Sequence, residues 1–258
     1  MSYWRCILPV GLNLTNVRII EMITIEAKEL LDKMIAQVFG YQNPMTLEQF
    51  MQKFTFDIRL PQPVIDMIDG HTTWAQSVNP TRFVSMKNAR DLDIGGASAK
   101  TDYLRPKRPL NSIEDILAAW NEINLVTTEH YNDSINVSES DNVNFSENVF
   151  RSQDVQRSKN VMLSDGVYRS EYMLACQRTA DSTFCIRVDD GINCTNSFNV
   201  SASANVTNCF FMHDAGDIQD SMFCTNIKGK RFCIANMQFE EAEYTQIRDV
   251  VARWILTG

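Results

Sequence analysis

The best candidates for catalytic chemistry in this sequence are a histidine and two pairs of carboxylates. His213 could act as a general base, the role that histidine has in acyltransferases built from six-residue repeats. The pairs Asp189 with Asp190 and Asp214 with Asp217 could supply the acid and base that cleave a polysaccharide. All five fall at outward or turn positions of the repeat described below. We therefore interpret them as solvated surface residues.

Cysteine could bind a metal or carry redox chemistry, and the chain has seven cysteines. Such sites need close pairs such as Cys-x-x-Cys, and the sequence has none. It also lacks a glycine-rich phosphate loop and a Gly-x-Ser-x-Gly nucleophile turn. We therefore predict no catalytic residues, no metal site and no cofactor. The odd number of cysteines favours free thiols, with one or two internal disulfides as the alternative if the protein meets an oxidant.

Composition indicates a globular protein and limits the classes of partner that it can bind. Hydrophobic residues make up 44% of the 258 residues, which excludes a wholly disordered chain. The 32 acidic residues outnumber the 24 basic ones, and the net charge of -8 argues against a nucleic-acid binder. No apolar run approaches the ~18 residues that cross a bilayer, and the first residues lack the layout of a signal peptide. We expect protein partners, without nucleic acid or membrane.

A six-residue repeat begins at Ile135 and continues without insertion to Asn236, which gives (236 − 134)/6 = 17 hexads. The first hexads read INVSES, DNVNFS, ENVFRS, QDVQRS, KNVMLS and DGVYRS, with valine third and serine sixth. Repeats of fixed short period are typical of solenoids. The pattern predicts a β-solenoid in which the third and sixth side chains of each hexad point into the tube.

The cysteines support this interpretation independently. Six of them are separated by 9, 9, 15, 15 and 9 residues, so all six fall at third or sixth positions. A small apolar thiol suits the narrow interior of a solenoid. The predicted structural core is the inward-facing set Val137, Val143, Val149, Val155, Val161, Val167, Cys176, Cys185, Cys194, Cys209, Cys224 and Cys233.

The length of one coil follows from the fourth position of each hexad. After an initial serine this position is apolar in odd-numbered hexads, and it is far more polar in even-numbered ones. The true repeat is therefore two hexads, which predicts 12-residue coils that form a thin tube of two facing sheets. About eight coils at ~4.8 Å spacing would extend about 40 Å. The predicted interface is the outward apolar stripe of Phe150, Met162, Leu174, Ile186, Phe198, Phe210, Met222 and Ile234.

This stripe exceeds the apolar area that a monomer normally exposes, so something must cover it. Two occupants stay open at this point. One is the set of N-terminal helices of the same chain, and the other is a second protein, either another copy or a different partner. The second positions of the early odd hexads are Asn136, Asn148 and Asn160, which could form a ladder of side-chain amides.

Residues 1–130 predict a mixed α+β domain that docks or caps. Apolar residues recur at helical spacing over 15–39, and Gly40 follows as a helix stop. Thr46 and Gln49 have the spacing of a capping box, which opens a short second helix. The alternating residues 54–60 predict a strand that ends at the prolines after it.

Two further helices are predicted at the ends of the solenoid. Ser112 and Asp115 form a second capping box, and we place the helix that they open over the first coil. Residues 240–256 predict an amphipathic helix over the last coil, because terminal coils expose unpaired backbone groups. The predicted fold is an α+β N-terminal domain (1–130), a β-solenoid of 12-residue coils (131–238) and a C-terminal capping helix (239–258).

The end of the repeat resembles a known group of proteins. Its motifs are Phe223-Cys224-Thr225-Asn226, then Cys233-Ile234 followed by Asn236 and Gln238, and finally Tyr244. Over residues 112–245 the chain is similar to the uncharacterised Ser/Asn/Cys-rich hexad-repeat proteins of tailed bacteriophages and candidate-phylum bacteria. The resemblance implies a virion component, associated with a capsid or tail, that is made in the bacterial cytoplasm.

Together these features predict a non-enzymatic structural or interaction protein that docks or oligomerises through its solenoid. The expected partners are further copies of the chain or other virion proteins. Two alternatives stay open: an acyltransferase or carbohydrate-active enzyme on a solenoid scaffold, and a cytoplasmic adaptor that inhibits a host protein through its acidic surface.

Overall fold

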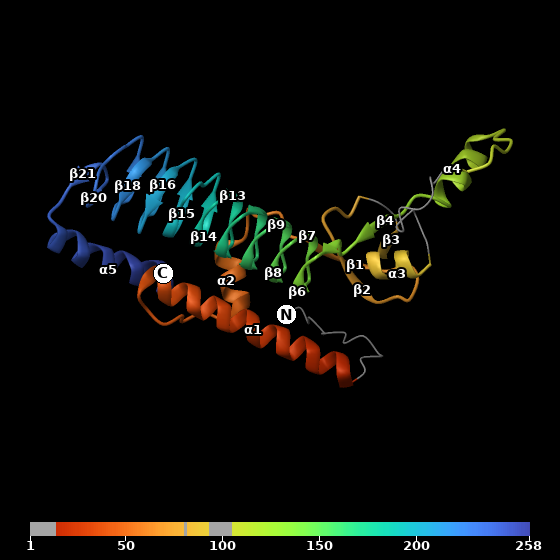
Figure 1. Ribbon diagram of the computed structural model, residues 1–258, viewed down its shortest axis with the longest axis horizontal. Coiled ribbons are helices and arrows are strands. Elements are labelled where there is room, and N and C mark those ends of the chain that lie inside the picture. Colours follow the sequence, from red (N-terminus) through yellow and green to blue (C-terminus); the bar gives the residue numbers. More distant parts are fainter. Residues whose placement is uncertain (1–13, 80–81, 93–104) are drawn as a thin grey trace, which may run out of the picture.

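The computed structural model describes residues 14–79, 82–92 and 105–258. Its main body is a β-solenoid of about nine turns over residues 131–234, which confirms the predicted fold class. Figure 1 shows the solenoid as a stack of short strands, with helices along one flank and a small mixed unit beyond the first turn. The solenoid strands are β5 (Tyr131–Asn132), β6 (Ile135–Ser138), β7 (Asp141–Asn144), β8 (Glu147–Phe150), β9 (Gln153–Gln156), β10 (Lys159–Met162), β11 (Asp165–Tyr168), β12 (Glu171–Leu174), β13 (Gln177–Ala180), β14 (Thr183–Asp189), β15 (Thr195–Ser201), β16 (Ala204–Thr207), β17 (Phe210–His213), β18 (Gly216–Gln219), β19 (Met222–Thr225), β20 (Cys233–Ile234) and β21 (Met237–Gln238).

Successive turns stack in parallel with an offset of twelve residues. Val149 pairs with Val161, and Val161 pairs with Met173 on the turn after that. The same offset joins Asp141 to Gln153 on the other side of the tube. The predicted coil of two hexads is therefore confirmed, and third-position side chains lie directly above one another.

Hexad positions two and five have a left-handed backbone conformation through most of the solenoid. The non-glycine residues with this conformation at these positions have φ between 43° at Arg151 and 58° at Tyr172. Asparagine and aspartate adopt this conformation more readily than other side chains. The backbone therefore accounts for the frequent asparagine at second positions, for example Asn148 with φ 56°.

The interior of the tube is a column of apolar side chains edged by buried serines. All the predicted core residues belong to it, with Val137 in the first turn partly buried and the others buried. The Ser152 hydroxyl donates to the Phe150 carbonyl at 2.9 Å and accepts from the Ser164 amide at 3.1 Å. The same pair of bonds recurs at Ser158 and its neighbouring turns. These buried hydroxyls are thus fully used, as buried polar groups normally are.

The two inward columns exchange roles halfway along the solenoid. Beyond β15 the third position holds small residues such as Ser203 and Ser221, and the sixth holds Val206 and Ile218. The exchange occurs at β14 and β15, which are seven residues long and span both columns. Ser203 accepts from the Ala215 amide at 3.0 Å, so the serine ladder resumes in the other column. The hexad register is kept, but the strand boundaries move by three residues.

Six cysteines lie in this interior as free thiols, among the residues that the structure describes. Burial raises the pKa of Cys176 to about 12 and the pKa of Cys194 to about 11. Neither is therefore a thiolate near neutral pH, the form that metal binding or redox chemistry requires. The thiols act as core side chains.

Three helices cover one flank of the solenoid (Figure 1). They are α1 (Leu14–Phe39), α2 (Leu47–Phe54) and α5 (Glu241–Thr257). The capping box of α2 has both predicted bonds: the Gln49 amide donates to Thr46 Oγ1 at 3.2 Å, and the Thr46 amide donates to Gln49 Oε1 at 2.9 Å. The first two helices were therefore predicted with nearly correct bounds.

The strand predicted over 54–60 is wrong. Residue 54 ends α2, and the Thr55 amide still donates to the Met51 carbonyl, so the chain leaves the helix through a turn. Arg187 on β14 then binds the Phe54 carbonyl at 2.6 Å and the Asp57 carboxylate at 2.8 Å. These contacts fix a turn where the alternation of apolar residues suggested a strand.

A small mixed unit lies beyond the first turn. In this unit β1 (Gln62–Ile65) pairs antiparallel with β2 (Thr72–Ala75), and β3 (Phe83–Ser85) pairs parallel with β4 (Val126–Thr128). A short helix, α3 (Met86–Asp91), follows β3. Pro63 is part of β1, which is tolerated because the sheet has only edge strands.

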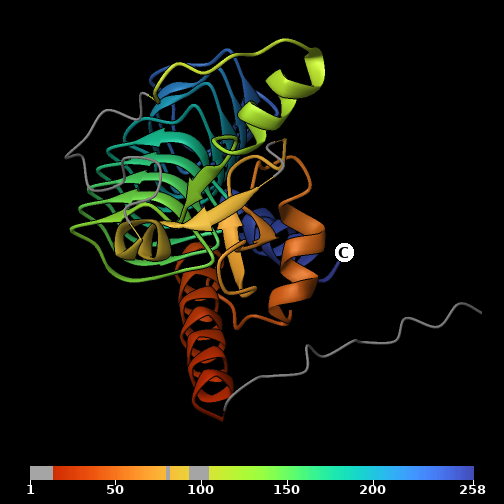
Figure 2. The same ribbon diagram turned by 90° about the vertical axis from the view of Figure 1, so that its right-hand side faces the viewer.

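Neither terminal helix lies where the sequence placed it. The helix α4 (Ile113–Asn121) has the predicted capping box but buries none of its residues, and in Figures 1 and 2 it stands apart from the solenoid. The C-terminal helix α5 runs along the flank instead of across the end, since Tyr244 contacts Phe232 and Trp254 contacts Phe211. The last turn is instead followed by the β20–β21 hairpin.

Candidate functional site

The stripe predicted as an interface is covered by the helices of the same chain. Phe39 of α1 contacts Phe198 at 5.1 Å and Phe210 at 5.4 Å between ring centres, and Phe54 of α2 contacts Phe198 at 5.5 Å. Met162, Leu174, Ile186, Phe198, Phe210 and Met222 are at most 2% exposed, while Phe150 and Ile234 are partly buried against the same cluster. Of the two occupants left open, the structure has the first. The assignment of these eight residues as an intermolecular interface is corrected accordingly, because helix packing already buries them.

The catalytic candidates of the sequence lie on the surface and are paired. His213 bonds Ser201 Oγ at 2.8 Å through Nδ1 and lies 3.1 Å from Asp214 through Nε2, with 61% of its side chain exposed. Both carboxylates of the pair Asp189 and Asp190 contact Arg178. Burial raises the pKa of Asp189, while hydrogen bonds from Arg178 lower the pKa of Asp190. The carboxylates of Asp189 and Asp190 are thus both paired with Arg178, and they do not form an acid–base pair across a substrate cleft.

One group of side chains has metal-ligating composition. Asp66, Asp69 and His71 have ligand atoms within 4.8 Å of one another, at the turn between β1 and β2. The Asn88 amide donates to Asp66 at 3.0 Å and to Asp69 at 2.9 Å, so a hydrogen-bond donor already bridges the two carboxylates. Burial opposes the ionisation of Asp66, but bonds from the amides of Ser85 and Ile68 outweigh it and lower the pKa. We interpret these hydrogen bonds as stabilising the turn between β1 and β2.

A second group forms a chain of hydrogen bonds where β4 meets the first turn. The buried carboxylate of Asp141 accepts from the backbone amide of His130 at 2.9 Å and lies 2.7 Å from its Nδ1. The other ring nitrogen, Nε2, lies 2.8 Å from Thr127 Oγ1. These residues line a hollow of about 390 Å³ together with Gln76 and Asn142. The order hydroxyl, imidazole, carboxylate is that of a hydrolase triad.

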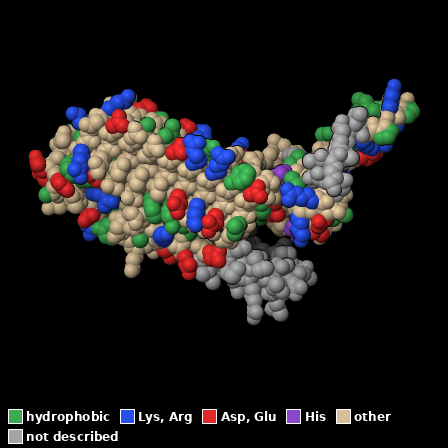
Figure 3. All heavy atoms as spheres, viewed as in Figure 1, with side chains coloured by type: hydrophobic (Ala, Val, Ile, Leu, Met, Phe, Trp, Pro, Cys, Tyr) green, Lys and Arg blue, Asp and Glu red, His purple; other side chains and the backbone are tan. Residues whose placement is uncertain are grey.

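The helix α4 has an exposed apolar face. Ile113, Ile116, Leu117 and Trp120 are between 46% and 65% exposed and recur at i, i+3, i+4 and i+7, which places them on one face. Figure 3 shows hydrophobic side chains on this arm, beyond the body of the molecule. On the other side Arg105 and Arg108 bind the Glu122 carboxylate, and Arg105 also binds the Ala119 carbonyl at 3.0 Å.

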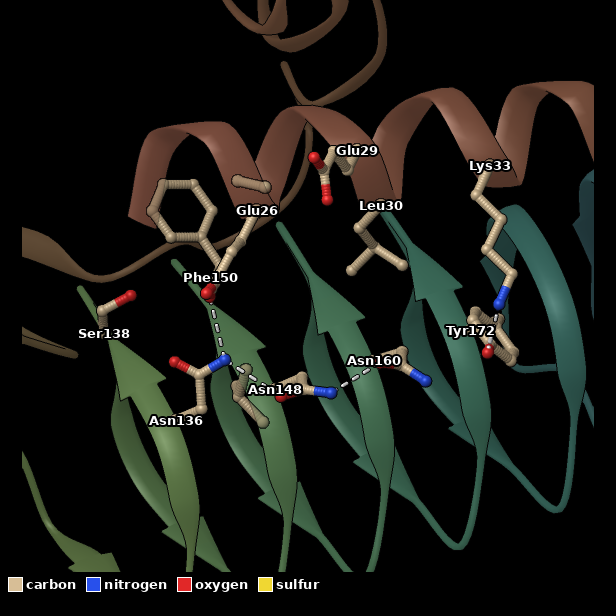
Figure 4. A pocket seen from close by; sticks show the side chains of 12 residues that line it. Glu26, Glu29, Leu30, Lys33, Asn136, Ser138, Asn148, Phe150, Asn160 and Tyr172 are labelled. Atoms are coloured by element: carbon tan, nitrogen blue, oxygen red, sulfur yellow. Dashed lines mark hydrogen bonds between the residues drawn. The ribbon is translucent and has the colours of Figure 1, made fainter. Parts of the chain in front are cut away.

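A groove with a mixed polar and apolar lining lies between α1 and the first turns of the solenoid (Figure 4). Its volume is about 320 Å³, near the lower end of the range for small-molecule sites. The predicted amide ladder forms its floor: Asn136 donates to Asn148 and Asn148 donates to Asn160, each at 2.9 Å. Glu26 closes one end by accepting from Asn136 at 3.1 Å.

The opposite end of the groove is closed by a lysine and two aromatic rings. The Lys33 ammonium lies 4.0 Å from the centre of the Tyr172 ring and bonds its hydroxyl. On its other side Tyr172 stacks on Phe184 with ring centres 4.3 Å apart. Between these ends Glu29 and Leu30 reach down from α1, as Figure 4 shows. The second-position residues change from asparagine at Asn160 to an aromatic ring at Tyr172, where the groove ends.

The exposed position of α4 and the groove over the asparagine ladder are not predicted from the sequence. The spacing on α4 and the asparagines of the ladder were visible, but the first was assigned to packing on the solenoid. The hydrogen-bond chain of Thr127, His130 and Asp141 had no signal, because residues of these types at these separations are common in any chain.

These elements define the chain as a two-sided β-solenoid with a helical flank and a projecting helical arm. Comparison with protein families, curated proteins and solved structures gives no match to it. None of the helices in the described ranges is long and apolar enough to span a membrane.

Proposed function

We propose that this chain is a non-enzymatic interaction protein that binds another protein through the apolar face of α4. The observation that carries this proposal is the exposure of Ile113, Ile116, Leu117 and Trp120 on a helix without a buried residue. Spacing of this kind is the pattern by which a helix places its anchors in the groove of a partner.

The helix α4 is already folded in the unbound chain. Isolated helices of nine residues are marginal in water, because nucleation is costly. Here the capping box of Ser112 and Asp115 satisfies the first turn, and the ion pairs of Glu122 with Arg105 and Arg108 tie the preceding segment to the helix. Less ordering entropy is then lost on binding.

The partner that fits best is a different protein with an apolar groove. Nine residues span about 14 Å, so two α4 helices packed side by side would bury far less than the ~1,200 Å² of a stable interface. A groove that surrounds the helix buries more of each side chain. The acidic first turn, Glu114 and Asp115, favours a groove with basic residues at its rim.

The solenoid supports this role as a rigid spacer. Nine turns at ~4.8 Å give a tube about 40 Å long, and the arm lies beyond its first turn. A virion component, as the resemblance to hexad-repeat phage proteins suggests, would use such a spacer between two attachment points. That assignment stays a prediction.

Leu117→Asp tests the proposal. We expect the full chain to retain a partner that the Leu117→Asp variant loses, with affinity lower by about thirtyfold or more, as for a central anchor. Val250→Asp on α5, where valine is 59% exposed, is the matched control and should bind normally.

The purified partner should also bind a peptide of residues 105–124 and shift the fluorescence of its single tryptophan, Trp120. Equal binding by Leu117→Asp, or a peptide that does not bind, would contradict the proposal.

A second candidate function is acyl transfer, favoured by the chain of Thr127, His130 and Asp141. For this function Thr127 Oγ1 gives its proton to His130 Nε2 as it attacks an ester carbonyl, and Asp141 holds the imidazole. The ester C–O bond then breaks, the alcohol leaves with the proton returned by His130, and water hydrolyses the acyl group from Thr127. The expected result is hydrolysis of p-nitrophenyl acetate that His130→Ala reduces about a hundredfold and His213→Ala leaves unchanged. Equal rates in both variants would exclude this function.

A further inference from the structure

We propose that the groove between α1 and the asparagine ladder binds a neutral oligosaccharide through one or two of its rings. This site is separate from the α4 face, so the two proposals stand or fall independently. The observation behind it is a hydrogen-bond donor without a protein acceptor, the amide of the largely buried Asn160 side chain, at the floor of an open groove.

Asn160 is 8% exposed, and its carbonyl oxygen accepts from Asn148. Among the described residues its amide nitrogen has no acceptor, and the second N–H of Asn148 is likewise unused. A side-chain amide carries two donors, so three N–H groups at the floor of the groove, two on Asn160 and one on Asn148, have no acceptor among the described residues. A ligand that supplies acceptors at the floor of the groove can form direct hydrogen bonds to these donors in place of water.

The opposite wall has the reverse chemistry. Glu26 and Glu29 line the groove from α1, and ionised carboxylates only accept hydrogen bonds. A ligand must therefore offer acceptors to the ladder and donors to the helix. Hydroxyl groups do both, and a sugar ring carries several of them around its edge. Ala27, Leu30 and Phe150 supply apolar surface for the C–H groups of such a ring.

Charge excludes two other classes of ligand. Two carboxylates face one ammonium group, and that ammonium, Lys33, is already held by Tyr172. An anion would therefore be repelled by Glu26 and Glu29. An organic cation would be attracted to them but would leave the amide donors of Asn148 and Asn160 without acceptors. A neutral polyol satisfies both walls, and about 320 Å³ accommodates one or two rings.

The test is calorimetric titration of the full chain with cellobiose, maltose and N,N′-diacetylchitobiose. We expect at least one to bind with a Kd below about 1 mM. Asn160→Asp should weaken that binding about tenfold or more, because aspartate keeps the shape and still accepts from Asn148 but has no N–H donor. Asn193→Asp makes the same change in an exposed asparagine outside the groove and should bind as the unaltered chain does.

A second variant protects the test against misfolding of Asn160→Asp. Leu30→Trp fills the groove from the helix side, leaves the ladder unchanged and should abolish binding. The proposal is overturned if none of the three disaccharides binds, if Asn160→Asp is folded and binds normally, or if trialanine binds better than any disaccharide. It is also overturned if cellobiuronic acid binds as tightly as cellobiose, because the carboxylates of Glu26 and Glu29 should repel it.

Discussion

Replacing Val155 by aspartate is expected to lower the free energy of unfolding by more than about 5 kcal/mol. Val155 is fully buried between Val143 and Val167, which pair with it from the two neighbouring turns, in the closely packed interior of the tube. The loss should show in urea unfolding followed by circular dichroism. Because a solenoid transmits stability between neighbouring turns, the turns beside residue 155 should also lose amide protection in hydrogen exchange.

The next residue on the same strand provides the control. Gln156 is exposed, and Gln156→Asp introduces the same side chain one position further along β9. We expect a change within about 0.5 kcal/mol, as for ordinary surface substitutions. If the two variants unfolded at the same urea concentration, the inward direction of the third position would be wrong, and so would the tube itself.

Replacing both Phe198 and Phe210 by aspartate is expected to detach the helical flank while the interior of the solenoid survives. The two rings contact Phe39 and are buried in a cluster that is separate from the valine and cysteine column. Removing one buried phenylalanine costs about 3–5 kcal/mol, and a buried charge adds to that. Hydrogen exchange should therefore become faster in α1 and α5 first, and the variant should bind a hydrophobic dye.

Light scattering separates this outcome from the alternative. The control is Phe145→Asp. Phe145 is an exposed aromatic residue with a left-handed backbone, which aspartate accepts, so this variant should leave hydrogen exchange unchanged. A double variant that keeps its helices protected but changes from an oligomer to a monomer would show that the stripe binds another chain.

The solenoid was predictable because its physical constraints repeat. Each turn must place a small or apolar side chain at Val149, Val161 and Met173 in succession, since these residues stack in register. A strict interior leaves a strict period in the sequence. The same period places the six cysteines at inward positions, where the structure has them buried.

Local sequence patterns predict the backbone less well where a residue distant in the sequence binds it. The alternation over 54–60 predicted a strand, but Arg187, 133 residues from Phe54, binds the backbone there and holds a turn. The capping boxes at Thr46 and Ser112 were correct, because a cap is made by residues three positions apart. Short-range hydrogen bonds can be predicted from sequence, whereas the partner of a loop cannot.

By itself, then, the sequence determined the inward columns, the twelve-residue coil, the asparagine ladder and the starts of the helices, because all of these depend on neighbours at fixed separations. Only the tertiary structure decided what each apolar face meets. The stripe is covered by α1, α2 and α5, whereas the face of α4 is left exposed and α1 leaves a groove over Asn160. Amphipathic spacing indicates which face of a helix is apolar. Because the hydrophobic effect is non-directional, this spacing does not determine which surface covers that face.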